Sequence, residues 1–143
     1  MLLAAANPLN ASEFIFPALE IFHITGFAML VGTTAVVDFR LLGAGILSGE
    51  TPAELARDLL PWNLVGLLFV LFSGPFMFLT DPDMYYLNHS FQAKMALFAA
   101  VLLFQYTIRG RLVKAGTAGK LVACVSLALW LSVIAAGVFI AFE

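Results

Sequence analysis

Residues 13–42 read EFIFPALEIFHITGFAMLVGTTAVVDFRLL, and this stretch sets the class of the protein. Between positions 14 and 37 it runs for 24 residues with only two side chains that can ionise near neutral pH, Glu20 and His23. An apolar run of that length is typical of a helix that crosses a bilayer, because about 20 helical residues span the hydrocarbon core. The stretch therefore predicts a first membrane-spanning helix.

Composition extends this interpretation to the whole chain. Hydrophobic residues make up 62% of the 143 positions and charged residues 11%. The mean hydropathy is +1.00, which is too apolar for a water-soluble domain of this size, and we expect lipid rather than nucleic acid as a partner. We expect a single transmembrane domain over residues 1–143. The chain lacks a basic segment and a long apolar run before Asn7, so we expect no cleaved signal peptide, with the first span acting as the insertion signal.

Four apolar runs predict an all-α membrane protein, an antiparallel bundle of four transmembrane helices. The expected spans are residues 14–37, 62–80, 88–109 and 120–142. A short amphipathic helix over residues 52–60 is expected in the first connection, where it would lie in the membrane interface and end at Pro61. The third helix is expected to begin at Pro82, ahead of its entry into the membrane.

Basic residues predict the orientation. Cytoplasmic loops of membrane proteins are enriched in Lys and Arg. The first and third connections hold all such residues except Lys94, namely Arg40, Arg57, Arg109, Arg111, Lys114 and Lys120. These connections are therefore expected in the cytoplasm, with both termini on the periplasmic side of a bacterial inner membrane.

The candidate site is a set of ionisable residues inside the predicted spans. Counted at about 1.5 Å per residue from Phe14 and Asn88, Glu20 and Lys94 both lie roughly 9 Å inside the membrane, and His23 lies roughly 14 Å inside. Charges at this depth are costly, so they are first candidates for function. A Glu20 to Lys94 ion pair would offset that cost and join the first helix to the third. Such a pair also has a purely structural explanation.

The histidines give the functional hypothesis. A b-type haem that passes electrons within the membrane would use His23 as one axial ligand and His89 as the candidate for the other, and Lys94 could meet a haem propionate. The depth count raises an objection, because His89 lies near the surface while His23 is buried. In that case His23 of a second subunit in a homodimer is an alternative second ligand.

Two other functions stay open. A copper or metal-handling protein, or a transporter of small solutes, would use His23 and His89, with Asp81, Asp83 and Met84 on the same side as further ligands. A structural or assembly subunit of a larger membrane complex would need no site. The single cysteine, Cys124, excludes an internal disulfide.

Asp38 and Arg40 close the first span at its cytoplasmic end. Because the connection that follows is short, it could fold back so that both charges pair with the segment from Arg109 to Lys114. We therefore expect Asp38 and Arg40, with Glu20, to form a structural or functional polar network.

The motifs resemble those of a family of small uncharacterised bacterial inner-membrane proteins with four spans. The resemblance covers nearly the whole chain and rests on Glu20-x-x-His23-x-x-Gly26, Asp38-Phe39-Arg40-Leu41-Leu42-Gly43, Pro61-Trp62, Ser73-Gly74, Phe91-x-x-Lys94 and Ser126-x-x-x-Trp130. Phe39, Ser73 and Gln105 depart from that pattern, which commonly has Leu, Thr and Asn there. The resemblance implies the fold and the importance of its polar motif residues, and names no reaction.

A shorter similarity is to the copper-resistance D-type membrane proteins, through the Phe91-x-x-Lys94 start of the third helix. His89 matches no motif of either family. A role for His89 therefore rests on its chemistry alone.

Overall fold

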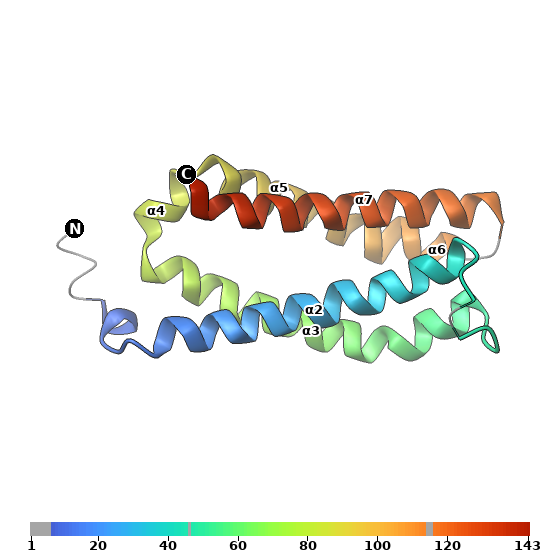
Figure 1. The fold of residues 1–143 in the computed structure, drawn as a ribbon, viewed down its shortest axis with the longest axis horizontal. Coiled ribbons are helices and arrows are strands. Elements are labelled where there is room, and N and C mark those ends of the chain that lie inside the picture. Colours follow the sequence, from blue (N-terminus) through green and yellow to red (C-terminus); the bar gives the residue numbers. More distant parts are fainter. Residues whose placement is uncertain (1–6, 46, 114–115) are drawn as a thin grey trace.

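The computed structural model describes residues 7–45, 47–113 and 116–143, and in this part of the chain every regular element is helical (Figure 1). The elements are η1 (Pro8–Asn10), α2 (Ile15–Leu41), α3 (Pro52–Thr80), α4 (Pro82–Tyr86), α5 (His89–Leu103), η2 (Phe104–Arg109), α6 (Gly110–Leu112), α7 (Thr117–Phe139) and η3 (Ile140–Phe142). η2 is a π-helical turn that joins α5 to α6. The expectation of no signal peptide concerns residues 1–6, which lie outside the described residues.

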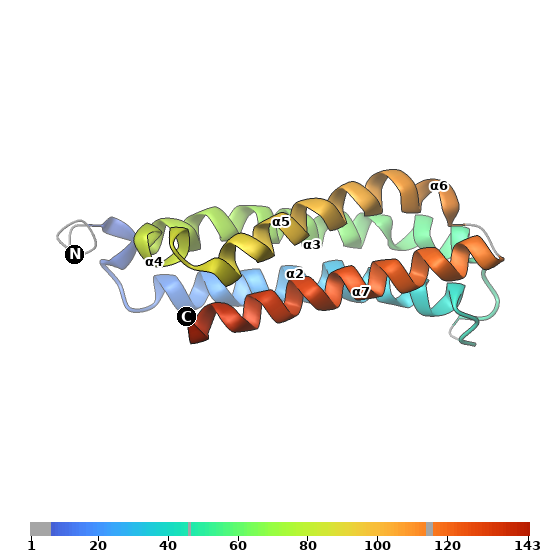
Figure 2. The same cartoon turned by 90° about the horizontal axis from the view of Figure 1, so that it is seen from above.

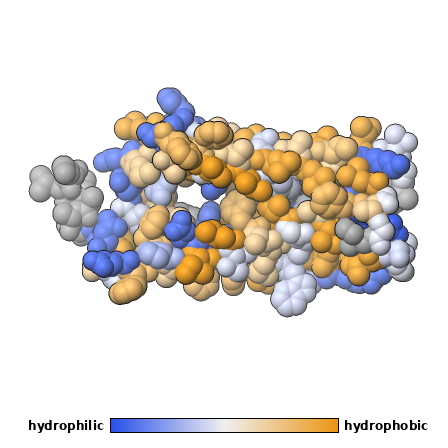
Figure 3. Space-filling view, in the orientation of Figure 1, coloured by the Kyte–Doolittle hydropathy of each residue, from blue (hydrophilic) through white to orange (hydrophobic). Residues whose placement is uncertain are grey.

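Four helices are long and apolar enough to cross a membrane, so the protein is an all-α integral membrane protein. They cover Ile15–Leu41, Pro52–Thr80, His89–Leu112 and Thr117–Phe142, the third combining α5, η2 and α6. Large apolar side chains remain exposed along their outer faces, as expected for helices surrounded by lipid (Figure 3). The predicted four-helix bundle is confirmed.

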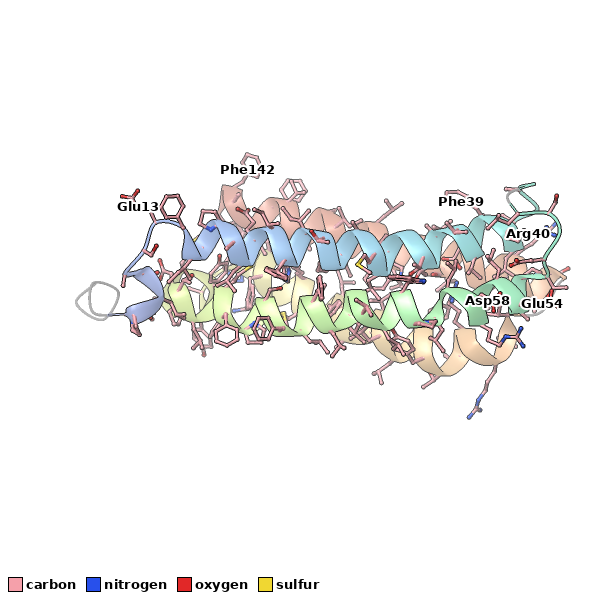
Figure 4. All side chains as sticks on the ribbon, turned by 90° about the horizontal axis from the view of Figure 1, so that it is seen from below. Glu13, Phe39, Arg40, Glu54, Asp58 and Phe142 are labelled. Atoms are coloured by element: carbon pink, nitrogen blue, oxygen red, sulfur yellow. The ribbon has the colours of Figure 1, made fainter. Side chains whose placement is uncertain are left out.

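The helices run antiparallel as two hairpins. α2 packs against α3, α5 packs against α7, and α2 also packs against α7 (Figures 1 and 2). Both ends of the described chain and α4 lie at one end of the bundle, and the end of α2, the start of α3, α6 and the start of α7 lie at the other, which we call the connection end. Among the labelled charges, Arg40, Glu54 and Asp58 lie at the connection end, and Glu13 lies at the opposite end (Figure 4).

The predicted end of a separate interfacial helix at Pro61 is wrong. α3 begins at Pro52 with a Thr51 and Glu54 capping box and continues through Pro61 and Pro75 to Thr80. Its 29 residues make a helix about 43 Å long at about 1.5 Å per residue. This exceeds a hydrocarbon core of about 30 Å, so the first turns of the same helix reach the interface.

The start of the third span also differs from prediction. Pro82 begins α4, but this helix stops at Tyr86, and α5 starts separately at His89. The Asn88 side chain caps α5 by accepting a hydrogen bond from the Phe91 N–H at 2.8 Å. The same side chain donates to the Ile140 carbonyl at 3.0 Å, which ties the start of α5 to the end of the fourth span.

Two glycines allow the closest helix crossing. A Cβ atom on Gly26 would lie 2.8 Å from the Gly66 carbonyl oxygen, and a Cβ on Gly66 would lie 2.8 Å from the Gly26 carbonyl oxygen. Real side chains do not tolerate such distances, so only glycine lets the α2 and α3 backbones approach this closely. Close approach through small residues is a common way for helices to associate in membranes.

The apolar core occupies the middle and the connection end of the bundle. The central cluster contains Leu30, Val70, Phe98, Val101, Trp130 and Val133. A second cluster at the connection end contains Val37, Leu41, Leu55, Val113 and Ala123. The half of the bundle nearer the chain ends contains a large cavity instead.

Candidate functional site

The His23 cavity is a hollow of about 680 Å³ between the spanning helices, in the half that carries the chain ends. Figure 3 shows the surface hollowed in this half, between the α2 and α7 layers. Its lining is mainly aromatic and aliphatic, with Glu20, His23 and Lys94 as its ionisable side chains apart from Tyr85. Cavities of about 300–1,000 Å³ with few polar groups are the usual form of small-molecule sites.

His23 is held by a hydrogen bond that determines its tautomer. Its Nδ1 atom lies 2.8 Å from Ser73 Oγ, and the Ser73 hydroxyl donates to the Phe69 carbonyl oxygen at 2.6 Å. Because a hydroxyl has only one hydrogen, we assign the other bond to Nδ1–H as the donor. Nε2 therefore keeps its lone pair and has no hydrogen-bond partner among the described residues.

This arrangement suits a metal ligand. A histidine that binds a metal through one ring nitrogen usually donates its other N–H to a neighbouring group, which orients the ring. Here Ser73 is that neighbour, and the Phe27 ring lies 5.3 Å from the imidazole centroid. The sequence motif Ser73-Gly74 falls beside His23, and a Cβ on Gly74 would lie 3.5 Å from His23 Cε1.

Lys94 lies in the same cavity, as the depth count predicts, but the predicted ion pair is wrong. Among the described residues Lys94 makes no salt bridge, and its Nζ atom lies 5.2 Å from the centroid of the Phe27 ring. Glu20 is exposed at the edge of the cavity. Depth counting gives the level of a residue but not the side of the helix on which it lies, so equal depth did not bring these charges together.

Glu20 lies near Tyr85 instead. Burial of the Tyr85 hydroxyl, with the nearby carboxylates of Asp81 and Glu20, raises the pKa of Tyr85. Tyr85 comes from α4 and packs its ring against Phe78 and Phe91. α4 therefore closes one side of the cavity with a neutral hydroxyl.

His89 does not line the cavity. It is exposed at the first position of α5, beside the end of the described chain. The Ser90 N–H donates to Glu143 Oε2 at 3.0 Å, and this hydrogen bond lowers the pKa of Glu143. The structure thus separates His89 from His23, in line with the objection from depth.

Methionines supply the other soft donors near His23. Met77, Met84 and Met95 all line the cavity, on α3, α4 and α5. Asp81 caps α4 by accepting from the Met84 N–H at 3.2 Å, and neither Asp81 nor Asp83 lines the cavity. In the described part of the chain, no three His, Cys, Asp or Glu side chains gather closely enough to hold a metal ion.

Asp38 belongs to a separate polar network at the connection end. Its Oδ1 atom accepts from Arg109 Nη2 at 2.8 Å and from Arg109 Nε at 3.1 Å. Its Oδ2 atom accepts from the Ser126 hydroxyl at 2.5 Å. The predicted contact between Asp38 and the Arg109 segment is confirmed, and it joins three of the four spanning helices.

Arg40 does not join that contact, contrary to prediction. Its Nη2 atom donates to the Glu50 carbonyl oxygen at 3.2 Å, and its Nε atom is buried without a partner among the described residues. Arg40 is two residues beyond Asp38, and side chains two residues apart point to different sides of an α-helix. Arg40 therefore faces away from Arg109. Lys114, the other end of the predicted partner segment, lies outside the described residues.

Sequence reasoning missed Asn63 on α3, which joins this network through Thr34. Asn63 Nδ2 donates to Thr34 Oγ1 at 3.0 Å, and Arg109 Nη2 donates to the Thr34 carbonyl oxygen at 3.3 Å. Asn63 Oδ1 accepts from Gln105 Nε2 at 2.9 Å and from the Tyr106 hydroxyl at 2.7 Å. The side chains of consecutive residues in an α-helix point in different directions and do not normally bind the same atom. Gln105 and Tyr106 lie in the π-helical turn over Phe104–Arg109, which allows both to donate to Asn63 Oδ1. The sequence did contain an indication of this site, because Asn63 is the one amide side chain in the otherwise apolar second span.

Trp130 completes the network from the fourth span. Its Nε1 atom donates to Gln105 Oε1 at 3.2 Å, and the indole is 2% exposed. The motif residues Ser126 and Trp130 thus bind Asp38 and Gln105, respectively. This network is buried and hydrogen-bonded, so we assign it a structural role and place the candidate functional site at His23.

A protein-family model described as "Family of unknown function (DUF6644)" matches residues 16–143. No curated protein and no solved structure matches the chain. The matched region contains His23, Lys94 and the Asp38 network, and it agrees with the resemblance to an uncharacterised family that the motifs indicate. The chain therefore belongs to this family of unknown function.

Proposed function

We propose that the protein binds a b-type haem in the His23 cavity and passes electrons within the membrane, with His23 as an axial ligand. The observation that carries the proposal is the Nδ1 hydrogen bond to Ser73, which leaves Nε2 unprotonated in a side chain that lines a large cavity. A neutral imidazole with an oriented ring is the form that ligates iron.

The other residues of the cavity fit a haem in size and chemistry. Its volume of about 680 Å³ is far larger than a single ion needs, and its apolar lining suits a macrocycle. Lys94 supplies one cation without a carboxylate partner in the described part of the chain. A haem carries two propionates, and one of them would give the Lys94 charge its counter-ion.

We propose that a methionine of the cavity would be the second residue to hold the haem. Met77, Met84 and Met95 line it, whereas His89 does not. Histidine with methionine is an established axial pair that raises the reduction potential of the iron. A bis-histidine site with His89 would require a different placement of the start of α5. In a homodimer, His23 of the second subunit would be the alternative second ligand.

These contacts indicate what each residue of the cavity would do when haem is bound. Bound haem would supply a one-electron couple. His23 would hold the iron, Ser73 would orient the imidazole through Nδ1, and Lys94 would neutralise a carboxylate. The aromatic lining, including Phe27 and Phe98, would exclude water and so affect the reduction potential.

We also propose a location and an orientation. Five described basic residues belong to the connection end of the bundle, namely Arg40, Arg57, Arg109, Arg111 and Lys120. The positive-inside rule places that end in the cytoplasm of a bacterial inner membrane. Both termini and the His23 cavity would then lie toward the periplasm.

The test is a reduced-minus-oxidised absorption spectrum of detergent-purified protein expressed with haem available. We expect a Soret peak and an α-band, with haem present at close to one per chain. Protein that is folded by circular dichroism but shows neither band under these conditions would overturn the proposal.

Copper handling is the second candidate, favoured by one observation. His23 and three methionines line a single cavity, and imidazole with thioether donors is a ligand set that selects Cu(I). Metal analysis of the purified protein distinguishes the two candidates. Copper without haem absorption, lost on His23→Ala, would favour this second function.

A further inference from the structure

A second cavity lies at the connection end of the bundle. This arginine cleft, about 420 Å³ in volume, opens between the first turns of α3 and the η2 and α6 end of the third span. Arg57, Arg109 and Arg111 line it, and the described lining residues include no Asp or Glu. Its walls contain apolar side chains such as Val37, Leu59 and Val113, so the cleft combines cationic and apolar surfaces.

Arg109 provides a buried donor at the inner end of the cleft. The residue is 7% exposed, and its Nε and Nη2 atoms are engaged by Asp38 Oδ1. Its third nitrogen, Nη1, has no hydrogen-bond partner among the described residues and is not among their fully enclosed unpaired atoms. A guanidinium that lines a cleft with one unused nitrogen is suited to receive an oxyanion.

The mouth of the cleft carries the other two arginines. Arg57 is exposed and contacts Asp58, which is also exposed, at 3.5 Å, a pair that water screens strongly. Arg111 is exposed and has no salt bridge in the described part of the chain. Asp38 neutralises Arg109 and Asp58 faces Arg57, so Arg111 supplies the positive charge of the cleft that has no ion-pair partner among the described residues.

The surroundings of the cleft are apolar. Leu60 is 44% exposed and lines it, while Trp62 on the next part of α3 is 60% exposed. Ile108 and Leu112 on the third span are 52% and 42% exposed. The backbones of α3 and the third span approach less closely than those of the packed helix pairs, with Asn63 bridging to Gln105 and Tyr106, and Leu60, Ile108 and Leu112 leave an exposed apolar seam beside the cleft.

From this combination we infer that the arginine cleft binds the phosphate group of an anionic membrane lipid, with the acyl chains lying along the seam between α3 and the third span. Basic pockets between spanning helices at the membrane surface are suited to acidic headgroups. A free phosphate would meet the same arginines but would leave the apolar walls in contact with water. The inference is independent of any group in the His23 cavity.

Native mass spectrometry of the detergent-purified full chain, titrated with short-chain phosphatidylglycerol or phosphatidylcholine, tests this inference. We expect phosphatidylglycerol to bind at least about fivefold more tightly, and Arg57→Gln or Arg111→Gln to weaken its binding about fivefold each. Lys120→Gln removes an exposed charge that does not line the cleft, so it should leave binding unchanged. Arg109 is left intact, because its loss would also disturb Asp38.

Three results would overturn the inference. Equal affinity for the two lipids would mean that the cleft does not recognise anionic headgroups. An equal loss of binding in Lys120→Gln would mean that net charge, rather than the cleft, attracts the lipid. Displacement of phosphatidylglycerol by inorganic phosphate at equal concentration would assign the site to a free anion instead. Circular dichroism of each variant shows whether a loss of binding reflects a loss of fold.

Discussion

Asp38 on α2 and Arg109 on the third span form a buried ion pair, with 2.8 Å between Oδ1 and Nη2 and side-chain exposures of 0% and 8%. Ser126 on α7 donates to the other carboxylate oxygen. Two charges at this level of burial require each other, because neither can be solvated alone. The pair therefore joins three helices that are separated in the sequence.

Asp38→Asn should strongly destabilise the protein. The amide keeps the shape of the side chain but leaves the Arg109 guanidinium buried without a counter-charge, at a cost of about 3–5 kcal/mol. Denaturant unfolding in detergent measures the change. Asp58→Asn is the matched control, since its pair with Arg57 is exposed and should contribute within about 0.5 kcal/mol. Equal effects of the two variants would contradict a structural role for the buried pair.

Gly26→Ala should force α2 and α3 apart. A Cβ atom there would lie 2.7 Å from Phe69 Cβ and 2.8 Å from the Gly66 carbonyl oxygen, so we expect a loss of about 1–3 kcal/mol in unfolding free energy. Gly32→Ala lies on the same helix with nothing within 4 Å of its new Cβ, and it should be neutral or slightly stabilising. A neutral Gly26→Ala would show that the two helices do not cross as closely as described.

Asn63→Leu should break the main polar link between α3 and the third span. The substitution leaves Gln105 Nε2 without its acceptor and releases the Tyr106 hydroxyl, which should cost about 1–3 kcal/mol. Thermal unfolding in detergent would record the change. Gln92→Leu, which alters an exposed amide on α5, is expected to have little effect. Similar melting curves for the two variants would argue against the network.

Cysteine labelling tests the orientation. Ser48→Cys and Ser12→Cys place thiols at exposed positions on opposite ends of the bundle, in a Cys124→Ala background because Cys124 is itself exposed. With an impermeant maleimide on intact cells, we expect labelling at position 12 and protection at position 48 until the cells are opened. The reverse pattern would place the arginine cleft outside the cell.

The spans were predictable because length and hydropathy alone determine which segments can cross a bilayer. Their ends were harder to place. Asp38 was assigned to the end of the first span where the chain meets water, whereas it is buried within α2, which ends at Leu41, and Arg109 neutralises it inside the bundle. Pro61 was taken as a stop, yet α3 passes through it, since packing along the rest of a 29-residue helix outweighs one lost backbone donor.

The site was predictable only as far as depth and residue type allow. Glu20 and Lys94 were placed at the same level with His23 one turn deeper, and all three line one cavity. Ser73, the partner of His23, comes from another helix 50 positions away, and the rotation of one helix against another is not encoded in residue counts. The ion pair between Glu20 and Lys94 was inferred from their equal depth alone. The structure does not form it, because residue counts do not show which way each helix faces.

The central claim is that His23 presents Nε2 to a haem in its cavity, and the most direct measurement is the reduced-minus-oxidised spectrum of wild type, His23→Ala and His89→Ala prepared in parallel. We predict haem bands in the wild type, their loss in His23→Ala and their retention in His89→Ala, because only His23 lines the cavity. Unchanged bands in folded His23→Ala protein, or no bands in the wild type, would contradict the account.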